Sequence, residues 1–416
     1  MRFIKRPEVV IGEDLMREVS DKVEDILSQI KKKGWESLVN ICQSLDGIAP
    51  FRINPKDMTK AWRDLSQDLK DALKMAEKNI RTFHRAQRDI FKTFECDVAD
   101  GIKAGIRFIP VKSTAIYVPG GRYPLPSSVL MGVIPAQEAG VERVVVLTPP
   151  GKEGNPNPVT LAAMGLLGVK EAWAIGGAQA VAAVAFGAGD IKPVDFIAGP
   201  GNVFVTEAKR QVFGTVGIDG LAGPSEVLIV ADESADPKFL AADMIAQLEH
   251  DPNAKATLLA TDETIAEKTI KEALNILSNL ETASIASISW EKGATIAVGS
   301  LQEIAEYADK LAPEHLELAL KDPQGKLQLF SCYGAAFLGK YSSVPFGDYI
   351  AGTNHVLPTG GSARFQGGLG VGTFLRPMQH LHLSPKAAAM LALHGATIAR
   401  AEGLAAHEIA MKLRHM

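Results

Sequence analysis

Short apolar segments alternate with helix-like segments from about residue 105 onward, and this alternation restricts the possible folds more than any other feature of the sequence. Eight segments read as apolar strands: TAIYVPGG, ERVVVLTPP, EAWAIGG, DFIAGPG, SEVLIVAD, ATLLATD, ATIAVGS and GAAFLG. Strands that are apolar throughout and alternate with helices are typical of parallel sheets buried on both faces. Eight such strands are too many for one compact unit. The sequence therefore predicts an α/β fold with two doubly wound parallel-sheet modules.

The chain divides into four predicted regions. Residues 1–105 contain long amphipathic stretches with apolar positions three and four apart, so this N-terminal region is predicted to be helical. The two sheet modules are predicted to span residues 106–232 and 233–375, with a junction near the segment GLAGPSE. Residues 376–416 are predicted to form a C-terminal tail, which is helical and rich in alanine from SPKAAAML onward.

Composition excludes several classes of function. The net charge of −4 and the aromatic content of 6% do not favour a nucleic-acid partner. No run of about 18 apolar residues exists, so no membrane span is expected. The three cysteines, Cys42, Cys96 and Cys332, lie too far apart for a metal-spaced pair or a disulfide framework. The N-terminus lacks the apolar core of a signal peptide, so we expect a protein of the reducing cytoplasm.

Three glycine-rich loops follow predicted strands of the first module. They read YVPGGRYPLPSS, IGGAQAV and AGPGNVFVTEAKR, and they carry Tyr117, Gln179 and Asn202. Ligands of doubly wound sheets bind beyond the carboxyl ends of strands, and glycine lets the backbone approach them closely. The GxGxxG spacing of a dinucleotide fingerprint is absent. The loops therefore indicate either a nucleotide site or ordinary tight turns.

Two polar clusters fall in the second module. In IAQLEHDPNA, helical spacing places Gln247 and His250 on one face and Glu249 on another. This pair could ligate a metal, or His250 could simply cap the helix C-terminus. In LAPEHLELAL, the proline predicts that Glu314 and His315 sit near a helix start. They could act as two bases for two proton transfers, or as a capping carboxylate beside a surface imidazole.

Two further clusters lie toward the C-terminus. The Gly/Pro-rich segment PFGDYIAGTNHVLPTGG carries Asp348 and His355, and such a loop is either functional or merely exposed. Glu402 and His407 are five residues apart near the end of the chain, which is not one face of a helix. Spacing alone favours a frayed terminal helix for this pair. The alternation in QHLHL would place two histidines on one face of a strand.

Together, these segments resemble the histidinol dehydrogenase family, and the resemblance covers nearly the whole chain. The motifs are YVPGG, SSVLM, GGAQA, GPGN.FVTEAKR, AGPSEV, Q.EHD, APEHLEL, GDY.AGTNHVLPTGG.ARF and EGLAAH. The resemblance implies two Rossmann-like modules, a homodimer, one zinc ion per subunit and NAD. It implies oxidation of L-histidinol to L-histidine through L-histidinaldehyde in two hydride transfers, the last steps of histidine biosynthesis.

The resemblance also assigns roles to individual residues. It implies that Glu314 and His315 are the two bases, and that zinc is bound by Gln247, His250, Asp348 and His407. NAD contacts are implied for Tyr117, Gln179 and Asn202. Substrate contacts are implied for Ser225, Gln247, His250, His315, Asp348, Glu402 and His407. The family further implies that the C-terminal tail reaches into the partner subunit, so that Glu402 and His407 complete the neighbouring site.

Two segments depart from the family pattern. Residues 122–126 read RYPLP, and the residues after ARF read QGGLGVGTFLRPMQHLHLSP. Both changes resemble relatives that oxidise other small polar alcohols, such as 2,3-dihydroxypropane-1-sulfonate. Arg122 could bind a sulfonate, bind an NAD phosphate or lie on the surface. A non-enzymatic α/β ligand-binding protein is a third hypothesis, but it would not need two bases beside four metal ligands.

Overall fold

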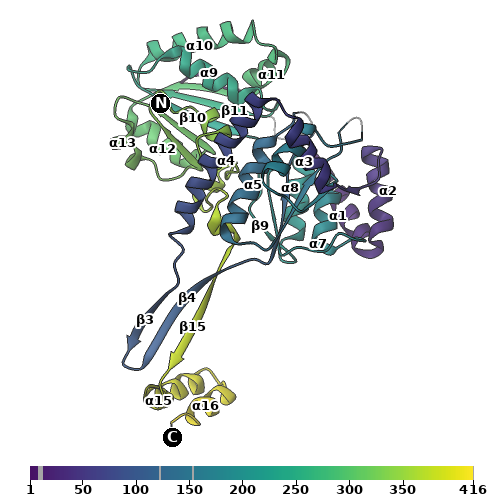
Figure 1. Cartoon of the computed structure of the whole chain (residues 1–416). Helices are drawn as coiled ribbons and strands as arrows, with labels where there is room; N and C mark the ends of the chain where they lie inside the picture. Colours follow the sequence, from purple (N-terminus) through teal and green to yellow (C-terminus); the bar gives the residue numbers. More distant parts are fainter. Residues whose placement is uncertain (8–12, 121–122, 152–153, 416) are drawn as a thin grey trace.

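The predicted α/β class is confirmed by a computed structural model, which describes residues 1–7, 13–120, 123–151 and 154–415 (Figure 1). Two six-stranded sheets form the body of the molecule. In each, five strands run parallel and one edge strand, contributed by the N-terminal region, pairs antiparallel. The described residues contain no helix that is long and apolar enough to cross a membrane.

The first sheet has the strand order β2-β7-β6-β5-β8-β9. Helices α5, α6, α7 and α8 follow or connect its strands and cover both faces. The strand bounds are β2 Phe51–Arg52, β5 Ser113–Tyr117, β6 Arg143–Thr148, β7 Glu171–Ala174, β8 Phe196–Ala198 and β9 Gly217–Ile218. The helix bounds are α5 Pro126–Ala139, α6 Pro158–Leu166, α7 Gly177–Phe186 and α8 Val203–Val212.

The second sheet has the order β1-β12-β11-β10-β13-β14. One face packs against α9, α10 and α11, and the other against α12. The strands are β1 Arg2–Lys5, β10 Glu226–Ala231, β11 Lys255–Ala260, β12 Ala294–Val298, β13 His315–Ala319 and β14 Ala335–Leu338. The helices are α9 Pro237–Leu248, α10 Glu263–Leu277, α11 Ala283–Gly293, α12 Leu301–Leu311, α13 Pro323–Lys326 and α14 Val344–Tyr349.

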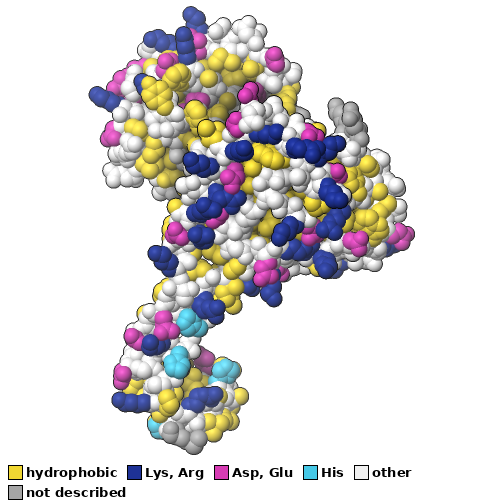
Figure 2. Space-filling view, viewed as in Figure 1, with side chains coloured by type: hydrophobic (Ala, Val, Ile, Leu, Met, Phe, Trp, Pro, Cys, Tyr) yellow, Lys and Arg dark blue, Asp and Glu magenta, His cyan; other side chains and the backbone are white. Residues whose placement is uncertain are grey.

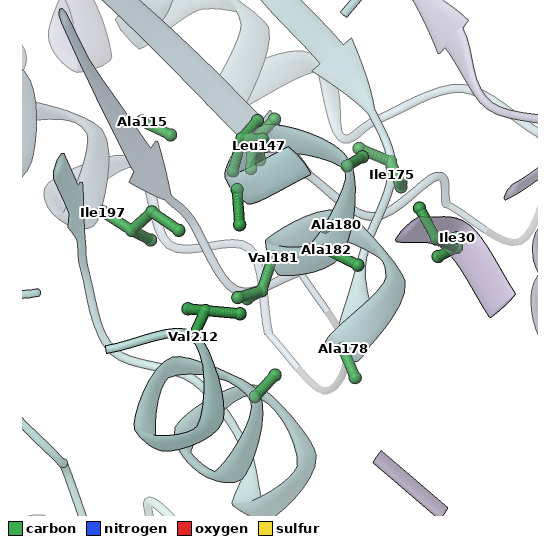
Figure 3. Packing of buried hydrophobic residues seen from close by; sticks show 14 of the residues in the cluster. Ile30, Ala115, Leu147, Ile175, Ala178, Ala180, Val181, Ala182, Ile197 and Val212 are labelled. Carbon is green, nitrogen blue, oxygen red and sulfur yellow. The ribbon is translucent and has the colours of Figure 1, made fainter. Parts of the chain in front are cut away.

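The N-terminal helices form outer layers on the first module. Helices α1 (Glu13–Lys33) and α2 (Trp35–Asp46) pack over α7 and α8, while α3 (Pro55–Asp64) and α4 (Gln67–Arg88) pack over α6 and α5. Figure 3 shows Ile30 of α1 in the same packed cluster as Ile175 and Ala182. The apolar stripe of each amphipathic helix is thus buried against the sheet module, as its spacing predicts.

The N-terminal region also supplies strands that we did not predict. β1 adds to the second sheet and β2 to the first, so residues 1–52 contact both modules. Each strand is short: β1 has four residues and β2 has two. Such short segments carry too little periodicity to be recognised beside long helices.

A three-stranded antiparallel arm extends from the body and carries the tail (Figure 1). It consists of β3 (Phe94–Ala99), β4 (Ile102–Pro110) and β15 (Leu375–Leu383). Asp100 and Gly101, with φ +73° at the glycine, form the two-residue turn between β3 and β4. The strand indicated by QHLHL is confirmed as part of β15. The tail helices, α15 (Pro385–Ala401) and α16 (Ala405–Lys412), lie at the far end of the arm.

The segment before β15 returns to the core of the first module. Short 3-10 turns at Ser362–Arg364 and Val371–Phe374 lead into it, and the Phe374 ring is fully buried. That ring packs edge-on against Phe196 of β8, with 5.6 Å between ring centroids. The aromatic pair therefore fixes the base of the arm to the first sheet.

Replacing Phe374 by alanine should lower the free energy of unfolding by about 3–5 kcal/mol, because a large cavity would open in a packed core. Urea unfolding of wild type and variant measures this. Phe365→Ala serves as a matched control, since that ring is 78% exposed and its removal should change stability by less than about 0.5 kcal/mol. Equal losses for the two variants would contradict the role given to Phe374.

Candidate active site

The candidate site lies where the carboxyl edge of the first sheet faces the amino edge of the second. His355 links the two sides, because its Nε2 lies 3.4 Å from the hydroxyl of Ser128 in the first turn of α5. On the other side, His315 begins β13 and Gln247 stands in the last turn of α9. Side chains from both modules therefore meet at one place.

The predicted helix start at Glu314 and His315 is wrong. Helix α12 ends at Leu311, Ala312 adopts a left-handed conformation with φ 47°, and Pro313 follows. Residues 315–319 are instead a central strand, paired with β10 on one side and β14 on the other. The proline marks the end of the preceding helix here, and all five residues of HLELA are buried, as in a strand covered on both faces, although two of them are polar.

His315 is a buried imidazole with one free nitrogen. Its Nδ1 lies 3.0 Å from the carbonyl oxygen of Glu226, so Nδ1 carries the proton and donates it. Its Nε2 has no hydrogen-bond partner and lies 3.7 Å from Oδ1 of Asp348, too far for a hydrogen bond. Burial lowers the pKa of His315 to about 4, against the raising effect of the Glu226 hydrogen bond. The ring is therefore neutral at pH 7, with its Nε2 lone pair available.

Glu314 is held beside His315 by the same backbone. Its Oε2 accepts from the Glu226 N–H at 2.9 Å and lies 3.6 Å from His315 Nδ1. Burial raises the pKa of Glu314 well above its usual range, although the Glu226 hydrogen bond opposes this. A carboxyl group with a raised pKa can take up a proton near neutral pH, as a general base must.

Gln247, His250 and Asp348 come together near this pair. Helix α14, which carries Asp348, contacts α9, which carries Gln247. Gln247 is buried and its Nε2 has no partner, while burial raises the pKa of Asp348 to about 7. His250 follows the end of α9, where its backbone N–H donates to the Gln247 carbonyl at 3.4 Å. Burial lowers the pKa of His250, and its charge would in turn lower the pKa of His315.

His355 belongs to the same cluster, although no specific role was predicted for it from the sequence. Its Nδ1–H donates to the Asp348 carbonyl at 2.9 Å, and burial lowers its pKa to about 4. The hydrogen bond ties the Gly/Pro-rich segment to the end of α14. The signal that could have identified His355 was its position seven residues after Asp348 in that segment.

The donor atoms of one chain fit a zinc ion only in part. The described residues contain no group of three or more His, Cys, Asp or Glu side chains arranged to hold a metal. The set brought together here has one imidazole, one carboxylate and one amide, and the Nε2 of that amide has no hydrogen-bond partner among the described residues. These atom types suit zinc, which binds four donors in most sites. One further donor from outside this cluster would complete the set.

The two tail residues lie elsewhere. Glu402 and His407 are exposed, on the end of α15 and on α16, at the far end of the arm from α9 and β13 (Figure 1). The structure of one chain therefore does not bring them to the cluster around His315.

Ser225 directly precedes β10, next to the Glu226 backbone that holds the two candidate bases. Its carbonyl accepts from the Lys255 N–H at 3.0 Å, which fixes the chain at this edge of the sheet. Arg122, the other candidate for substrate recognition, falls outside the described residues.

The three candidate NAD residues lie at the carboxyl edge of the first sheet. Tyr117 ends β5, and its hydroxyl accepts from the Gly177 N–H at 3.1 Å. Gln179, in the first turn of α7, donates from Nε2 to Asp46 at 3.1 Å. Asn202 caps α8 by accepting from two backbone N–H groups. Tyr117 and Gln179 therefore shape the loop between β7 and α7, and Asn202 lies at the start of α8, which follows β8.

Gly177 is required at this edge for a steric reason. Its φ is +65°, and a Cβ there would come within 2.3 Å of the Gln179 side-chain oxygen. The glycine therefore permits the close approach that the loop needs.

Replacing His315 by glutamine should make the stability of the metal-free protein less sensitive to acid. The pKa of His315 in the folded protein is about 4, below its ordinary value of 6.5, so its stabilising contribution is present above about pH 6.5 and is lost as pH falls through 4. The loss is on the order of 3 kcal/mol in wild type. Urea unfolding between pH 7 and pH 4 measures it, and identical pH dependence in both proteins would contradict the burial of a neutral imidazole.

Comparison with known proteins identifies the family. The family model described as histidinol dehydrogenase matches residues 12–415. "Histidinol dehydrogenase" of Zymomonas mobilis is 44% identical over 94% of this chain and 91% of its own length, and that of Thermus thermophilus is 43% identical over 95% and 94%. A crystal structure of histidinol dehydrogenase from Elizabethkingia anophelis superposes with a TM-score of 0.92, at 35% identity, covering 98% of this chain and 94% of that one. The chain belongs to the histidinol dehydrogenase family.

Proposed function

We propose that this protein oxidises L-histidinol to L-histidine in a zinc- and NAD-dependent reaction, through L-histidinaldehyde, as the last steps of histidine biosynthesis. One observation carries most of the argument. His315 is held neutral, with Nε2 free, beside Glu314 and Asp348 at the junction of the two modules. A dehydrogenase of an alcohol needs such a free base where a substrate hydroxyl can reach it.

The two bases serve two different proton transfers. His315 Nε2 would take the hydroxyl proton as the carbon of histidinol gives up a hydride, which NAD would accept when bound, and the aldehyde results. Glu314 would then remove a proton from a water molecule as the water oxygen bonds to the aldehyde carbon. The carbonyl oxygen would take back the proton held by His315, and the resulting gem-diol would give up the second hydride. The overall change is histidinol, two NAD⁺ and water to histidine and two NADH with release of protons. Both groups are buried, so the site would shield the aldehyde from bulk solvent between the steps.

We assign the zinc ligands as Gln247, His250 and Asp348 of one subunit and His407 of another. Two imidazoles and two oxygen donors suit zinc. When bound, zinc would hold the amino alcohol and polarise its hydroxyl group without taking part in redox chemistry. Ser225, His315, Glu402 and the metal ligands are the proposed contacts of the substrate.

NAD would bind at the carboxyl edge of the first sheet, with Tyr117, Gln179 and Asn202 as contacts. The support is positional. All three lie where ligands of doubly wound sheets bind. Gln179 and Asn202 lie at the starts of α7 and α8, and the positive end of a helix dipole favours an anion there. The Tyr117 hydroxyl stays protonated, since burial raises its pKa to about 12.

A different alcohol, such as 2,3-dihydroxypropane-1-sulfonate, is the second candidate substrate, and the structure gives it less support. In the segment after ARF, which departs from the family pattern, Leu369 and Phe374 belong to the apolar core of the first module, and Val371 is also buried. These residues therefore serve packing. Named relatives at 39–44% identity are histidinol dehydrogenases, which favours histidinol.

We further propose a homodimer in which each tail completes the partner's site. Arm and tail expose many apolar side chains, which Figure 2 shows toward the lower end of the molecule. Among those more than 40% exposed are Phe94, Val98, Met378, Leu381, Met390, Leu393, Ile398, Ile409 and Leu413. Apolar area of this extent marks an interaction surface. Together with the remote position of Glu402 and His407, it favours a second copy of the chain as the occupant.

A cytoplasmic location completes the proposal. All three cysteines are free thiols, and one of them, Cys96, is exposed. Unpaired and exposed thiols are typical of proteins in a reducing compartment.

The purified enzyme with zinc should reduce about two NAD per histidinol consumed, which absorbance of NADH measures. His315→Asn should lower turnover by about 10²-fold or more, because it removes the base at the reacting hydroxyl. The variant should still bind zinc, since His315 is not among the proposed ligands. Absence of NADH formation with histidinol and zinc present, or faster turnover of dihydroxypropanesulfonate, would reject histidinol as the substrate.

Mixing two inactive variants tests the exchange of tails. His315→Asn disables the site in the body, and His407→Asn disables the tail. In a mixed dimer, one site combines an intact body with an intact tail, so random reassortment should restore about a quarter of wild-type activity. Co-expression of the two variants and an NADH assay measure this. Activity no greater than that of either variant alone would show that each tail serves its own subunit.

A further inference from the structure

A half-buried and a buried carboxyl group lie behind the candidate site, and the proposed reaction does not use them. Asp243 belongs to α9, and Glu317 belongs to β13. Their side chains are hydrogen-bonded to each other. Two carboxylates cannot share a hydrogen bond unless one carries a proton, and burial accordingly raises the pKa of both groups. A protein does not maintain such a pair in its interior without cost.

The pair lies one layer below Gln247 and His315. Helix α9 follows β10 and returns toward the start of β11, so it runs opposite to the parallel strands. Asp243 comes one turn before Gln247, a step of about 6 Å along the helix. Glu317 comes two residues after His315 on the same face of β13, a step of about 6.6 Å. The step from Gln247 to Asp243 and the step from His315 to Glu317 are similar in length and point in the same direction. Asp243 therefore lies behind Gln247, and Glu317 lies behind His315.

Two buried atoms in this layered arrangement have no partner among the described residues. One is Nε2 of Gln247, which can only donate, and the other is Oε2 of Glu317, which in the ionised group can only accept. Asp243 is hydrogen-bonded to the Glu317 carboxyl group and holds it in place. The side-chain amide of Gln247 can turn about its last torsion, which is broad. The Gln247 amide thus has a donor without an acceptor, and the Glu317 carboxyl group, one layer deeper on the same side of the sheet, has an acceptor without a donor.

We propose that Glu317, held in place by Asp243, is a positioning residue for Gln247: its Oε2 accepts from the Gln247 amide and turns the amide oxygen toward the metal site. Only the oxygen of an amide binds a cation, so an amide turned the other way would not serve as a ligand. The hydrogen bond from Glu317 selects the productive orientation, as carboxylates behind metal-binding side chains do elsewhere. This inference rests on the proposed role of Gln247 as a zinc ligand.

The affinity of the metal-stripped, full-length protein for Zn²⁺ alone tests the proposal, by competition with a chromophoric chelator. Glu317→Met keeps the length of the side chain and removes both oxygens, so zinc affinity should fall by about 10- to 100-fold. Glu317→Gln keeps one oxygen acceptor and should bind zinc more tightly than Glu317→Met. Leu318→Ala is the matched control, because this buried side chain of the same strand faces the opposite side of the sheet. It should lower stability and leave zinc affinity unchanged.

A double-mutant cycle separates this inference from the proposed function. Gln247→Ala alone should weaken zinc binding, and Glu317→Met should then have no further effect, since its partner is gone. If Gln247→Ala leaves zinc affinity unchanged, the proposed metal site is wrong and the inference falls with it. If Gln247→Ala weakens zinc binding but Glu317→Met does not, the positioning role of Glu317 is wrong and the metal site stands. The same conclusion follows if the effects of the two substitutions simply add in the double variant. Should Glu317→Met fail to fold, Asp243→Ala replaces it, with about 10-fold weaker binding expected and unchanged binding decisive against the proposal.

Discussion

The backbone of Glu226 holds the candidate site together. Its N–H donates to Glu314 and its carbonyl accepts from His315, so one peptide segment fixes both candidate bases. This is possible because β10 and β13 are parallel neighbours with Val227 opposite His315. The Glu226 side chain also accepts from the Gly360 N–H, which fixes the loop after His355. The pairing of two central strands thus determines the tautomer of His315 and the position of Glu314.

Burial explains the direction of the pKa shifts in the site. Low polarity disfavours the charged form of any group, so the pKa values of His315 and His355 fall while those of Glu314 and Asp348 rise. No opposite charge among the described residues lies close enough to offset this effect. A cation among these groups would favour the ionised carboxylates. The cluster would therefore suit the positive charge of the proposed zinc ion.

The sequence predicted the fold class because strand and helix periodicities are local properties. The eight apolar segments recognised in this way correspond to eight of the parallel strands in the two sheets, namely β5, β6, β7, β8, β10, β11, β12 and β14. β13 was missed because Pro313 and the charged pair beside it suggested a helix start. The short edge strands β1 and β2 were missed because pairing partners more than 100 residues away define them.

The site was less accessible to local reasoning. Spacing paired Gln247 with His250, but Asp348 joins them through packing of α14 against α9, which no local pattern reveals. Only the resemblance, through its motif set, connected these residues. The Asp100-Gly101 turn of the arm, by contrast, carried a local hairpin signal that was available in the sequence.

The arm gives the tail residues a physical context. A nine-residue strand pair between β4 and β15 carries α15 and α16 away from the body, so Glu402 and His407 cannot serve the site of their own chain in this conformation. The same arm and tail expose apolar side chains, which a second subunit would cover in the proposed dimer. In a twofold-symmetric dimer the contact is reciprocal, so each subunit that extends its tail to its partner also receives the partner's tail. If His407 is the missing zinc ligand, a single chain holds an incomplete donor set. Catalysis would then require the dimer, because the arm and tail that join the subunits also supply this ligand.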